Sequence, residues 1–201
     1  MMKFNFSRKF DFPPEIQMKG FSENMKLIKE TTLLGVILTD DLKWSANTYH
    51  ICCKAYKKIW ILRRLKLLDS DPTFVLDVYK KEIRSVLEVA VPAWHSGLTV
   101  QQSSDIERVQ KVAVSLILGN PRLSYSESLE ILELETLEAR REKLCLTFAK
   151  RTLKSRHSSL FEKSNPVYNT RYGGTYKEQR ANTARFYNSP LNYLTRLLNH
   201  S

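Results

Sequence analysis

The pattern of apolar and polar residues changes near residue 45. Before that point apolar residues alternate with polar ones over short stretches, as at Phe4 and Phe6. Alternation with a period of two is typical of strands that bury one face. We therefore predict short strands in this part, the last of them closed by a turn at Thr39-Asp40-Asp41. The expected strands cover residues 15–18, 27–29 and 33–38.

From Ser45 onward apolar residues recur every three or four positions, which predicts helices with one buried stripe. Local signals mark several helix ends. Asp71 with Pro72 opens the second helix, and a third begins near Thr99 and stops at Gly119. The stripe of the first helix consists of Ile51, Ala55, Ile59, Leu62 and Leu65. The expected helices cover about residues 45–68, 72–91, 99–118, 125–132, 137–156 and 191–198.

These elements predict a mainly α fold, a helical bundle preceded by a small antiparallel β segment. We divide the chain into residues 1–44, residues 45–156, and a polar arm with a short C-terminal helix over residues 157–201. Two-stranded sheets are marginally stable alone. The first region is therefore expected to be the edge of something larger, whereas the helical region is long enough to bury its own core.

Composition adds a preference for an acidic partner. The chain has 201 residues, and 32 Lys and Arg against 21 Asp and Glu give a formal net charge of +11. Such a surplus favours nucleic acid first and an acidic membrane surface second, with an ordinary solvated basic surface as the alternative. No apolar run approaches the roughly 20 residues that span a bilayer. We expect no membrane segment.

The cysteines and the N-terminal residues suggest an intracellular protein. Three cysteines are an odd number without a disulfide spacing, which fits free thiols in a reducing compartment. The first ten residues contain no apolar run of signal-peptide length. The sequence does not distinguish the nucleus from the cytoplasm.

Two of the expected helices carry basic faces, which suit sequence-independent contacts with phosphates. If about four phosphates were neutralised on a duplex, the log–log salt slope would be roughly −3 to −4. The alternative is an ordinary solvated helix face. The candidate nucleic-acid-binding residues are Lys54, Lys57, Lys58 and Arg64 on the first helix, and Arg140, Lys143, Lys150 and Lys154 on the last long helix.

Aromatic residues allow two interpretations. Trp44, Trp60 and Trp94 can stack on bases, but their apolar neighbours favour a role in the core or as anchors. Near the C-terminus, arginines alternate with tyrosines, which fits either an arm for single-stranded RNA or a linker. The residues of this arm are Arg171, Tyr172, Tyr176, Arg180, Arg185 and Tyr187.

Asp40 and Asp41 are the residues that invite a catalytic interpretation, since polymerases hold two metal ions on carboxylates. Two-metal chemistry needs carboxylates from at least two segments, and no upstream acid ends an apolar strand that leads into a helix. We therefore interpret the pair as part of a turn. The four histidines form no nucleophile or metal-ligand pattern. No catalytic residue, metal site or cofactor is expected.

Several short motifs follow one another along residues 33–200. They are Leu34-Gly35-Val36-Ile37-Leu38 with Asp41-Leu42-Lys43-Trp44; Ala55 to Leu65; Tyr79, Ile83, Ser85, Val86, Leu87 and Ala93-Trp94-His95; Ile106-Glu107-Arg108-Val109-Gln110-Lys111 with Ile117-Leu118-Gly119; Leu134, Leu137, Arg140-Arg141 and Leu144; and Ser189 to Leu194. Their order resembles the C-terminal part of non-LTR (LINE-type) retrotransposon reverse transcriptases, which are RNA-directed DNA polymerases.

The resemblance implies a palm edge, a primer grip and a helical thumb that holds a template–primer duplex. The residues that match the primer grip are Leu34, Gly35, Val36, Asp41 and Trp44. The fingers and the catalytic aspartate motifs of that family lie outside this chain. We therefore expect binding to the backbone of RNA or an RNA/DNA duplex, without a catalytic centre. The alternatives are a helical protein-interaction module and a non-functional remnant of a retroelement.

Overall fold

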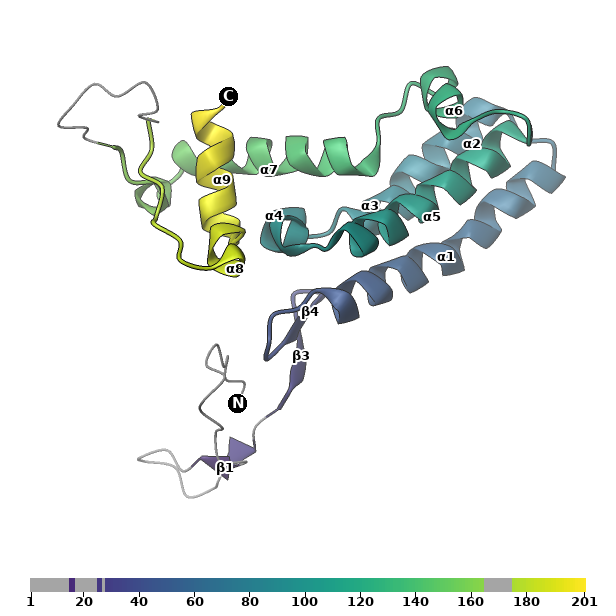
Figure 1. The fold of residues 1–201 in the computed structure, drawn as a ribbon. Helices are drawn as coiled ribbons and strands as arrows, with labels where there is room; N and C mark the ends of the chain where they lie inside the picture. The colour runs from purple at the N-terminus through teal and green to yellow at the C-terminus, as the bar shows by residue number, and fades with distance from the viewer. Residues whose placement is uncertain (1–14, 17–24, 27, 165–174) are drawn as a thin grey trace.

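The computed structural model of the chain describes residues 15–16, 25–26, 28–164 and 175–201, and it is mainly helical (Figure 1). The predicted fold class is confirmed. The described elements are β1 (Glu15–Ile16), β2 (Met25–Lys26), β3 (Glu30–Leu33), β4 (Val36–Thr39), α1 (Ser45–Leu67), α2 (Pro72–Val78), the π-helical segment η1 (Tyr79–Arg84), α3 (Ser85–Leu87), α4 (Val91–Trp94), the 3₁₀ turn η2 (His95–Gly97), α5 (Val100–Leu118), α6 (Tyr125–Ile131), α7 (Leu137–Leu153), the 3₁₀ turn η3 (Ser158–Leu160), α8 (Ala184–Tyr187) and α9 (Pro190–Asn199).

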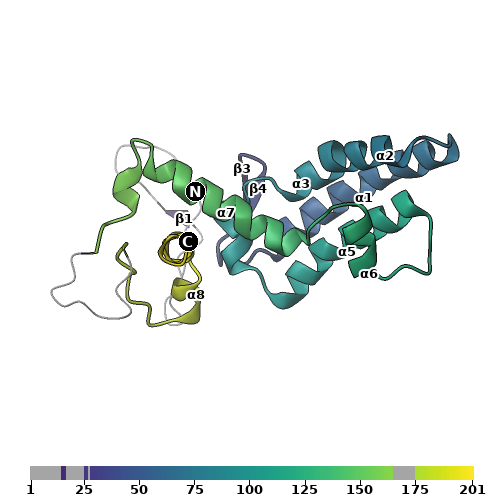
Figure 2. The same cartoon turned by 90° about the horizontal axis from the view of Figure 1, so that it is seen from above.

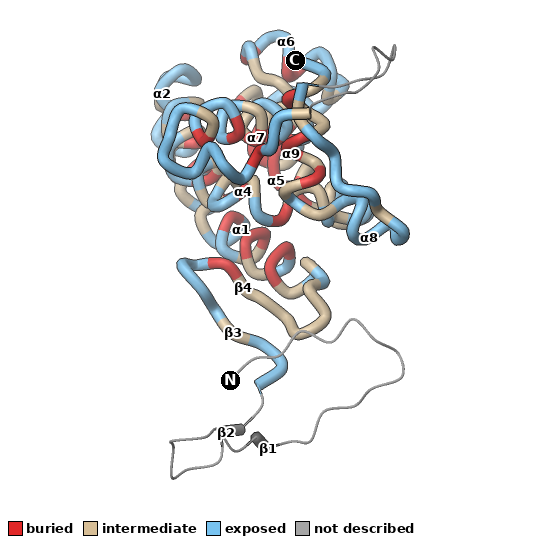
Figure 3. Tube along the Cα trace, turned by 90° about the vertical axis from the view of Figure 1, so that its left-hand side faces the viewer, coloured by how far each residue is buried: buried red, intermediate tan, exposed pale blue. Residues whose placement is uncertain are grey.

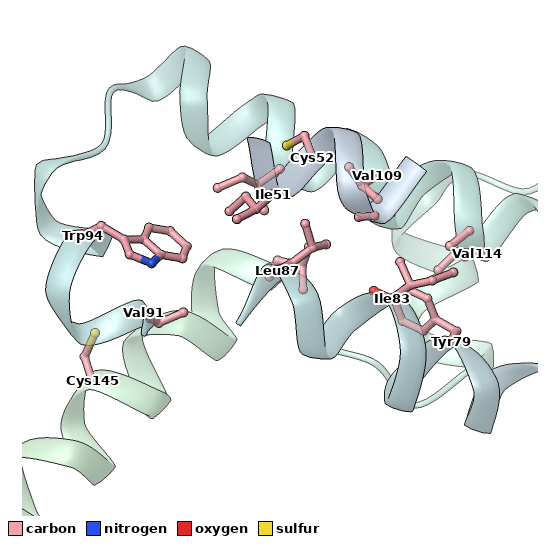
Figure 4. Packing of buried hydrophobic residues seen from close by; sticks show 14 of the residues in the cluster. Ile51, Cys52, Tyr79, Ile83, Leu87, Val91, Trp94, Val109, Val114 and Cys145 are labelled. Carbon is pink, nitrogen blue, oxygen red and sulfur yellow. The ribbon is translucent and has the colours of Figure 1, made fainter. Parts of the chain in front are cut away.

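The core forms where α1 packs along α5 and against the continuous helix made by α2, η1 and α3. Four of the five stripe residues of α1, all except Leu65, are buried as predicted. Figure 4 shows side chains from several helices meeting in one cluster. Each large aliphatic side chain buried in this way contributes about 1.5–3 kcal/mol before the entropy cost is subtracted.

Short side-chain caps fix the helix starts. The side chains of Asp71, Thr99, Ser124 and Thr136 each accept a hydrogen bond from a backbone N–H in the first turn of the helix that follows. Gly119 ends α5 in the left-handed conformation, with φ of 64°. Ser189 precedes α9 without a capping bond from its side chain, and Pro190 marks the start of that helix.

A π-helical segment replaces regular α-helix in the middle of the second predicted helix. Val75, Tyr79, Ile83 and Leu87 are all buried and lie four residues apart. In a regular α-helix each step of four residues overshoots one turn by about 40°, because a turn takes about 3.6 residues. The wider turn of η1, with its i→i+5 bonds, offsets this drift. All four side chains can therefore face the core.

The strand predicted over residues 33–38 is wrong in one respect, because the chain reverses in its middle. β3 and β4 are the two arms of an antiparallel hairpin, with Leu33 opposite Val36. The two-residue loop of Leu34 (φ 50°) and Gly35 (φ 83°) has the left-handed values that a type I′ turn needs. The hairpin extends beyond the helices from the N-terminal end of α1 (Figures 1 and 3). A second hairpin pairs β1 with β2.

The C-terminal helix docks on the bundle. α9 contacts α7, α4 and η2, and it crosses α7 in Figure 1. Leu194 and Leu198 of α9 belong to the same buried cluster as Val36 of β4. The boundaries at residues 44 and 156 remain predictions, although one apolar cluster connects all three predicted regions.

Candidate nucleic-acid interface

The outer face of α1 is basic from Lys54 to its C-terminal end. This helix has six Lys or Arg residues and no Asp or Glu among its 23 residues. Two of the six have partners inside the molecule: Lys58 pairs with Glu82 at 2.8 Å, and the Nζ of Lys66 donates to the carbonyl of Ile117 at 3.3 Å. The other four are exposed and form no ion pair with a described residue. We call Lys54, Lys57, Arg63 and Arg64 the α1 cations.

The predicted set of binding residues on α1 therefore loses one residue and gains another. Lys54, Lys57 and Arg64 project into solvent as expected, whereas Lys58 is half-buried and bonded to Glu82. Arg63 was not predicted, although it is exposed. Its position beside Arg64 in the sequence was the available signal.

The three tryptophans occupy three different environments. Trp94 is fully buried, and its Nε1 donates to the carbonyl of Val89 at 2.8 Å. Trp44 is half-buried at the start of α1 and lies against Gly97, where an added Cβ would come within 2.4 Å of its Nε1. Trp60 is 60% exposed. The expectation of a core or anchor role holds for Trp94 and Trp44 and is wrong for Trp60.

Exposed aromatic side chains accompany the α1 cations. Tyr49, Tyr56 and Trp60 are all exposed and lie on the side of α1 away from Ile51 and Leu62. We call these three residues the aromatic stripe. Because residues three and four apart are neighbours on a helix surface, Trp60 has Tyr56 on one side and the α1 cations around it. Lys57, Arg63 and Arg64 are these neighbouring cations.

The basic face of α7 is largely neutralised at its N-terminal end. Arg140 forms a bidentate ion pair with Glu88, and Lys143 pairs with Glu135. Arg140 also lies 3.8 Å from Glu135. Towards the other end, Lys150 and Lys154 are exposed and have no ion pair with a described residue. α1 and α7 extend towards opposite ends of the molecule in Figures 1 and 2.

A cavity of about 470 Å³ lies between η1 and the start of α7. Lys80, Arg84, Arg140 and Lys143 bring four cations to its wall, but Glu133 and Glu135 line it as well. Glu88 also contacts both of the arginines. The acids therefore nearly balance the cations in this cavity, unlike on α1.

The acidic pair belongs to a turn, as predicted. Asp41 accepts hydrogen bonds from the Thr39 hydroxyl at 2.8 Å and from the Lys43 N–H at 3.1 Å, and it pairs with the Lys43 ammonium at 3.0 Å. Slight burial raises the pKa of Asp41, but these bonds and the Lys43 charge outweigh it and lower the pKa to about 2. Asp40 donates its backbone N–H to Lys29 at the hairpin end.

The residues matching the primer grip divide between the hairpin and the helix start. Leu34 is 91% exposed at the hairpin turn beside Gly35, whereas Val36 is buried. Asp41 holds the turn before α1, and Trp44 begins that helix. The backbone N–H of Ile37 donates to the Asn47 side chain at 3.1 Å, which ties the hairpin to α1.

Sequence reasoning missed a polar network in the core, although Tyr79, Glu107 and Gln110 are motif residues of the resemblance. The Tyr79 hydroxyl donates to Gln110 at 2.5 Å, and the Gln110 amide donates to the Tyr125 hydroxyl and the Glu135 carbonyl, both at 2.9 Å. Glu107 accepts from the Tyr125 hydroxyl and from the N–H of Leu137. Burial raises the pKa of Tyr125 and the Glu107 bond adds to this effect. These residues join η1, α5, α6 and the start of α7.

Arg141 forms a second buried polar site. It is 1% exposed and has no ion pair with a described residue. Its Nε donates to Nδ1 of His95 at 3.3 Å and its Nη2 to the Ser103 hydroxyl at 2.7 Å, while Nη1 is without a hydrogen-bond partner among the described residues. Burial, with the Arg141 charge, lowers the pKa of His95 to about 4. Motif residues thus hold helices together here too.

The C-terminal arm is described only in part. Arg171 and Tyr172 lie outside the described residues. Tyr176 bonds through its backbone to the Asn199 side chain, and an isolated bridge joins it to Lys163. Arg180 and Arg185 are exposed, whereas Tyr187 lies under the guanidinium of Arg196, 3.7 Å from the ring centroid. This arrangement is compatible with both interpretations of the segment, an arm for single-stranded RNA and a linker.

Comparison of the chain with known protein families, with curated proteins and with solved structures finds no match. The resemblance to reverse transcriptases therefore remains a prediction. Among the described residues no three His, Cys, Asp or Glu side chains group as metal ligands. No helix in the described ranges has the length and apolarity to cross a bilayer.

Proposed function

We propose that this protein binds the phosphate backbone of nucleic acid, without reading sequence, through the outer face of α1. The observation that carries the proposal is the absence of any acidic residue on this helix while four cations remain unpaired within the described part of the chain. Phosphate contacts from Lys and Arg supply most of the free energy of non-specific binding. A rigid helix supported by a packed core presents such cations in a fixed row.

The resemblance to retrotransposon reverse transcriptases gives this proposal a context. In it, α1 is the first helix of a thumb that holds a template–primer duplex, and the β3–β4 hairpin is the edge of a palm. We propose no catalytic centre for this chain, because Asp41 is fully engaged by Thr39 and Lys43. Nucleotide incorporation in a primer-extension assay with Mg²⁺ would contradict this part of the proposal.

The salt dependence of binding to an RNA/DNA duplex tests the role of α1. With about four phosphates neutralised, the log–log salt slope should be roughly −3 to −4. Lys57→Ala and Arg64→Ala should each weaken binding at low salt and reduce the slope by about one. The measurement is fluorescence anisotropy of a labelled duplex over a series of salt concentrations.

A matched control uses a lysine that is also exposed but has an ion-pair partner. Lys81 is exposed and pairs with Asp77 at 3.2 Å one turn away. Lys81→Ala removes the same charge but should leave the slope unchanged, because that charge is already compensated. Equal effects of Lys57→Ala and Lys81→Ala would mean that net charge alone controls binding and that α1 is no specific interface.

A protein-interaction function has one observation in its favour. Leu67, Leu68 and Phe74 are exposed around the turn between α1 and α2, and exposed apolar clusters can mark contacts with proteins. If nucleic acid does not bind at low salt, this face becomes the better candidate. Retained duplex binding by a Leu67→Ser/Leu68→Ser variant would separate the two surfaces.

A further inference from the structure

Trp60 is exposed at the centre of the α1 cations, where an ordinary solvated surface rarely holds a tryptophan. The residue is 60% exposed, and no cation stacks on its ring among the described residues. Tyr56 lies one turn before it, and Tyr49 is 74% exposed on the same side of the helix. The aromatic stripe covers about 16 Å of helix axis. The unpaired cations lie beside its C-terminal part, around Trp60.

This combination fits one class of ligand better than the others. Cations alone suit any phosphate backbone, including that of a duplex. Exposed ring faces add stacking, but only unpaired bases offer their own faces for it, because the bases of a duplex are already stacked on each other. An apolar protein partner would gain nothing from the unpaired charges around Trp60.

We propose that the aromatic stripe is a stacking platform that makes α1 bind single-stranded nucleic acid in preference to duplex. Trp60, with Tyr56 and Tyr49 beside it, contacts bases, while Lys57, Arg63 and Arg64 contact the phosphates on either side. The inference rests on the proposed function and specifies the ligand of the same surface. It requires no base-specific hydrogen bond, so preference among bases follows stacking strength.

The experiment compares one unstructured oligonucleotide with a duplex of the same length. Labelled oligo(dT) of roughly 12 nucleotides is within the usual size of single-strand sites. Trp60→Ala should weaken binding of the single strand about 5- to 150-fold, the range measured for loss of one stacked base. Binding of the duplex should change less than about twofold, because the α1 cations are intact. Trp60→Phe should restore part of the affinity.

Intrinsic fluorescence gives a second readout that a change in fold would not imitate. Trp94 is buried and Trp44 is half-buried, so a base stacked on the outside of α1 reaches only the indole of Trp60. Adding oligo(dT) should quench part of the wild-type emission and none of the emission of Trp60→Ala. Far-UV circular dichroism checks that the variant keeps its helices, which an exposed position should allow.

Phe74 provides the matched control. It is exposed to a similar extent on α2, but acidic Asp71 and Asp77 lie three residues before and after it. Phe74→Ala should leave binding of both ligands unchanged. An equal loss of single-strand binding in Phe74→Ala would overturn the inference, because any exposed aromatic would then matter.

The remaining outcomes separate this inference from the function on which it rests. If Trp60→Ala binds oligo(dT) as tightly as wild type while Lys57→Ala weakens both ligands, stacking is refuted and backbone binding stands. If neither ligand binds at about 50 mM salt, where backbone contacts are strongest, both proposals are refuted. A blue shift of Trp60 emission with anionic phospholipid vesicles, without quenching by oligo(dT), would also refute stacking and indicate a membrane surface.

Discussion

α1 and α7 both carry several Lys and Arg residues, but the two helices differ in how many of these cations form ion pairs. On α1 four cations are exposed without a partner among the described residues. On α7, Arg140 is bonded to Glu88 in the turn after α3, and Lys143 is bonded to Glu135 in the loop just before α7. The comparison shows that acidic partners in the loops and turns packed beside a helix decide whether its basic face is available to a ligand.

The two helices also use their arginines for different purposes. Arg140 binds Glu88 in the turn after α3, and Arg141 binds His95 of η2 and Ser103 of α5, so both arginines attach α7 to neighbouring parts of the fold. The side chains of Arg63 and Arg64 on α1 form no ion pair or hydrogen bond with a described residue. Substitutions on α7 should therefore act mainly on folding, and substitutions on the outer face of α1 mainly on binding.

The largest expected effect is at Arg141, on the α7 side. Arg141→Ala leaves a cavity and unpaired polar atoms at His95 and Ser103, and should lower the free energy of unfolding by about 3 kcal/mol. Arg141→Met keeps much of the volume and removes a buried charge that has no described acid partner, so its cost should be about 1 kcal/mol or less. Urea unfolding at neutral pH measures both. A Met variant as unstable as the Ala variant would show that the guanidinium itself stabilises the fold.

A pH dependence of intermediate size should come from the same site. The pKa of His95 is lowered by burial and by the Arg141 charge from 6.5 to about 4. Between these values the unfolded chain binds a proton that the folded protein does not, so stability is complete above pH 6.5 and falls as the pH drops towards 4. Allowing for the partial exposure of the ring, the loss should be about 2 kcal/mol.

The test of this dependence is urea unfolding from pH 7 to pH 4 for wild type and His95→Asn. The variant starts with lower stability but should lose less of it across the range, because the titrating group is gone. Parallel curves for the two proteins would show that other groups cause the acid dependence.

The smallest expected effect tests, on α7, whether an acidic partner makes a cation unavailable to nucleic acid. Glu135→Gln frees Lys143 and leaves Arg140 paired only with Glu88. If partners decide availability, the salt slope for duplex binding should steepen by up to about one. Glu130→Gln is the control, since Glu130 is exposed and has no ion pair with a described residue. This substitution changes the net charge by the same amount as Glu135→Gln. The same steepening in both variants would make net charge the cause.

The helices could be predicted because their signals are local. Thr99, Ser124 and Thr136 cap helices within three residues of their own positions, and apolar spacing of three and four identifies the buried faces. The hairpin turn was missed because Leu34 takes a left-handed conformation that Asn or Gly usually occupies. The pattern of apolar residues alone therefore indicated one strand where there are two.

The candidate interface was predictable only in part, because it depends on contacts between distant residues. The sequence placed Lys57 and Arg64 on an outer face, but nothing near Arg140 indicated that the distant Glu88 would neutralise it. Trp60 has the apolar neighbours Ile59 and Ile61, which favoured burial. Its exposure follows from the helical period, because Trp60 lies on the side of α1 opposite the buried stripe of Ile51 and Leu62, and the period was the better guide.

The π-helical segment η1 has a consequence for the length of the chain between α1 and α5. Val75, Tyr79, Ile83 and Leu87 are four residues apart throughout, so the segment contains one residue more than a regular helix needs to align them. Removing one residue between Tyr79 and Ile83 would give spacings of four, three and four, which an ordinary helix places on one side. This stretch should therefore tolerate the deletion of a single residue. The same deletion within α5 would rotate the apolar residues on one side of it away from the core.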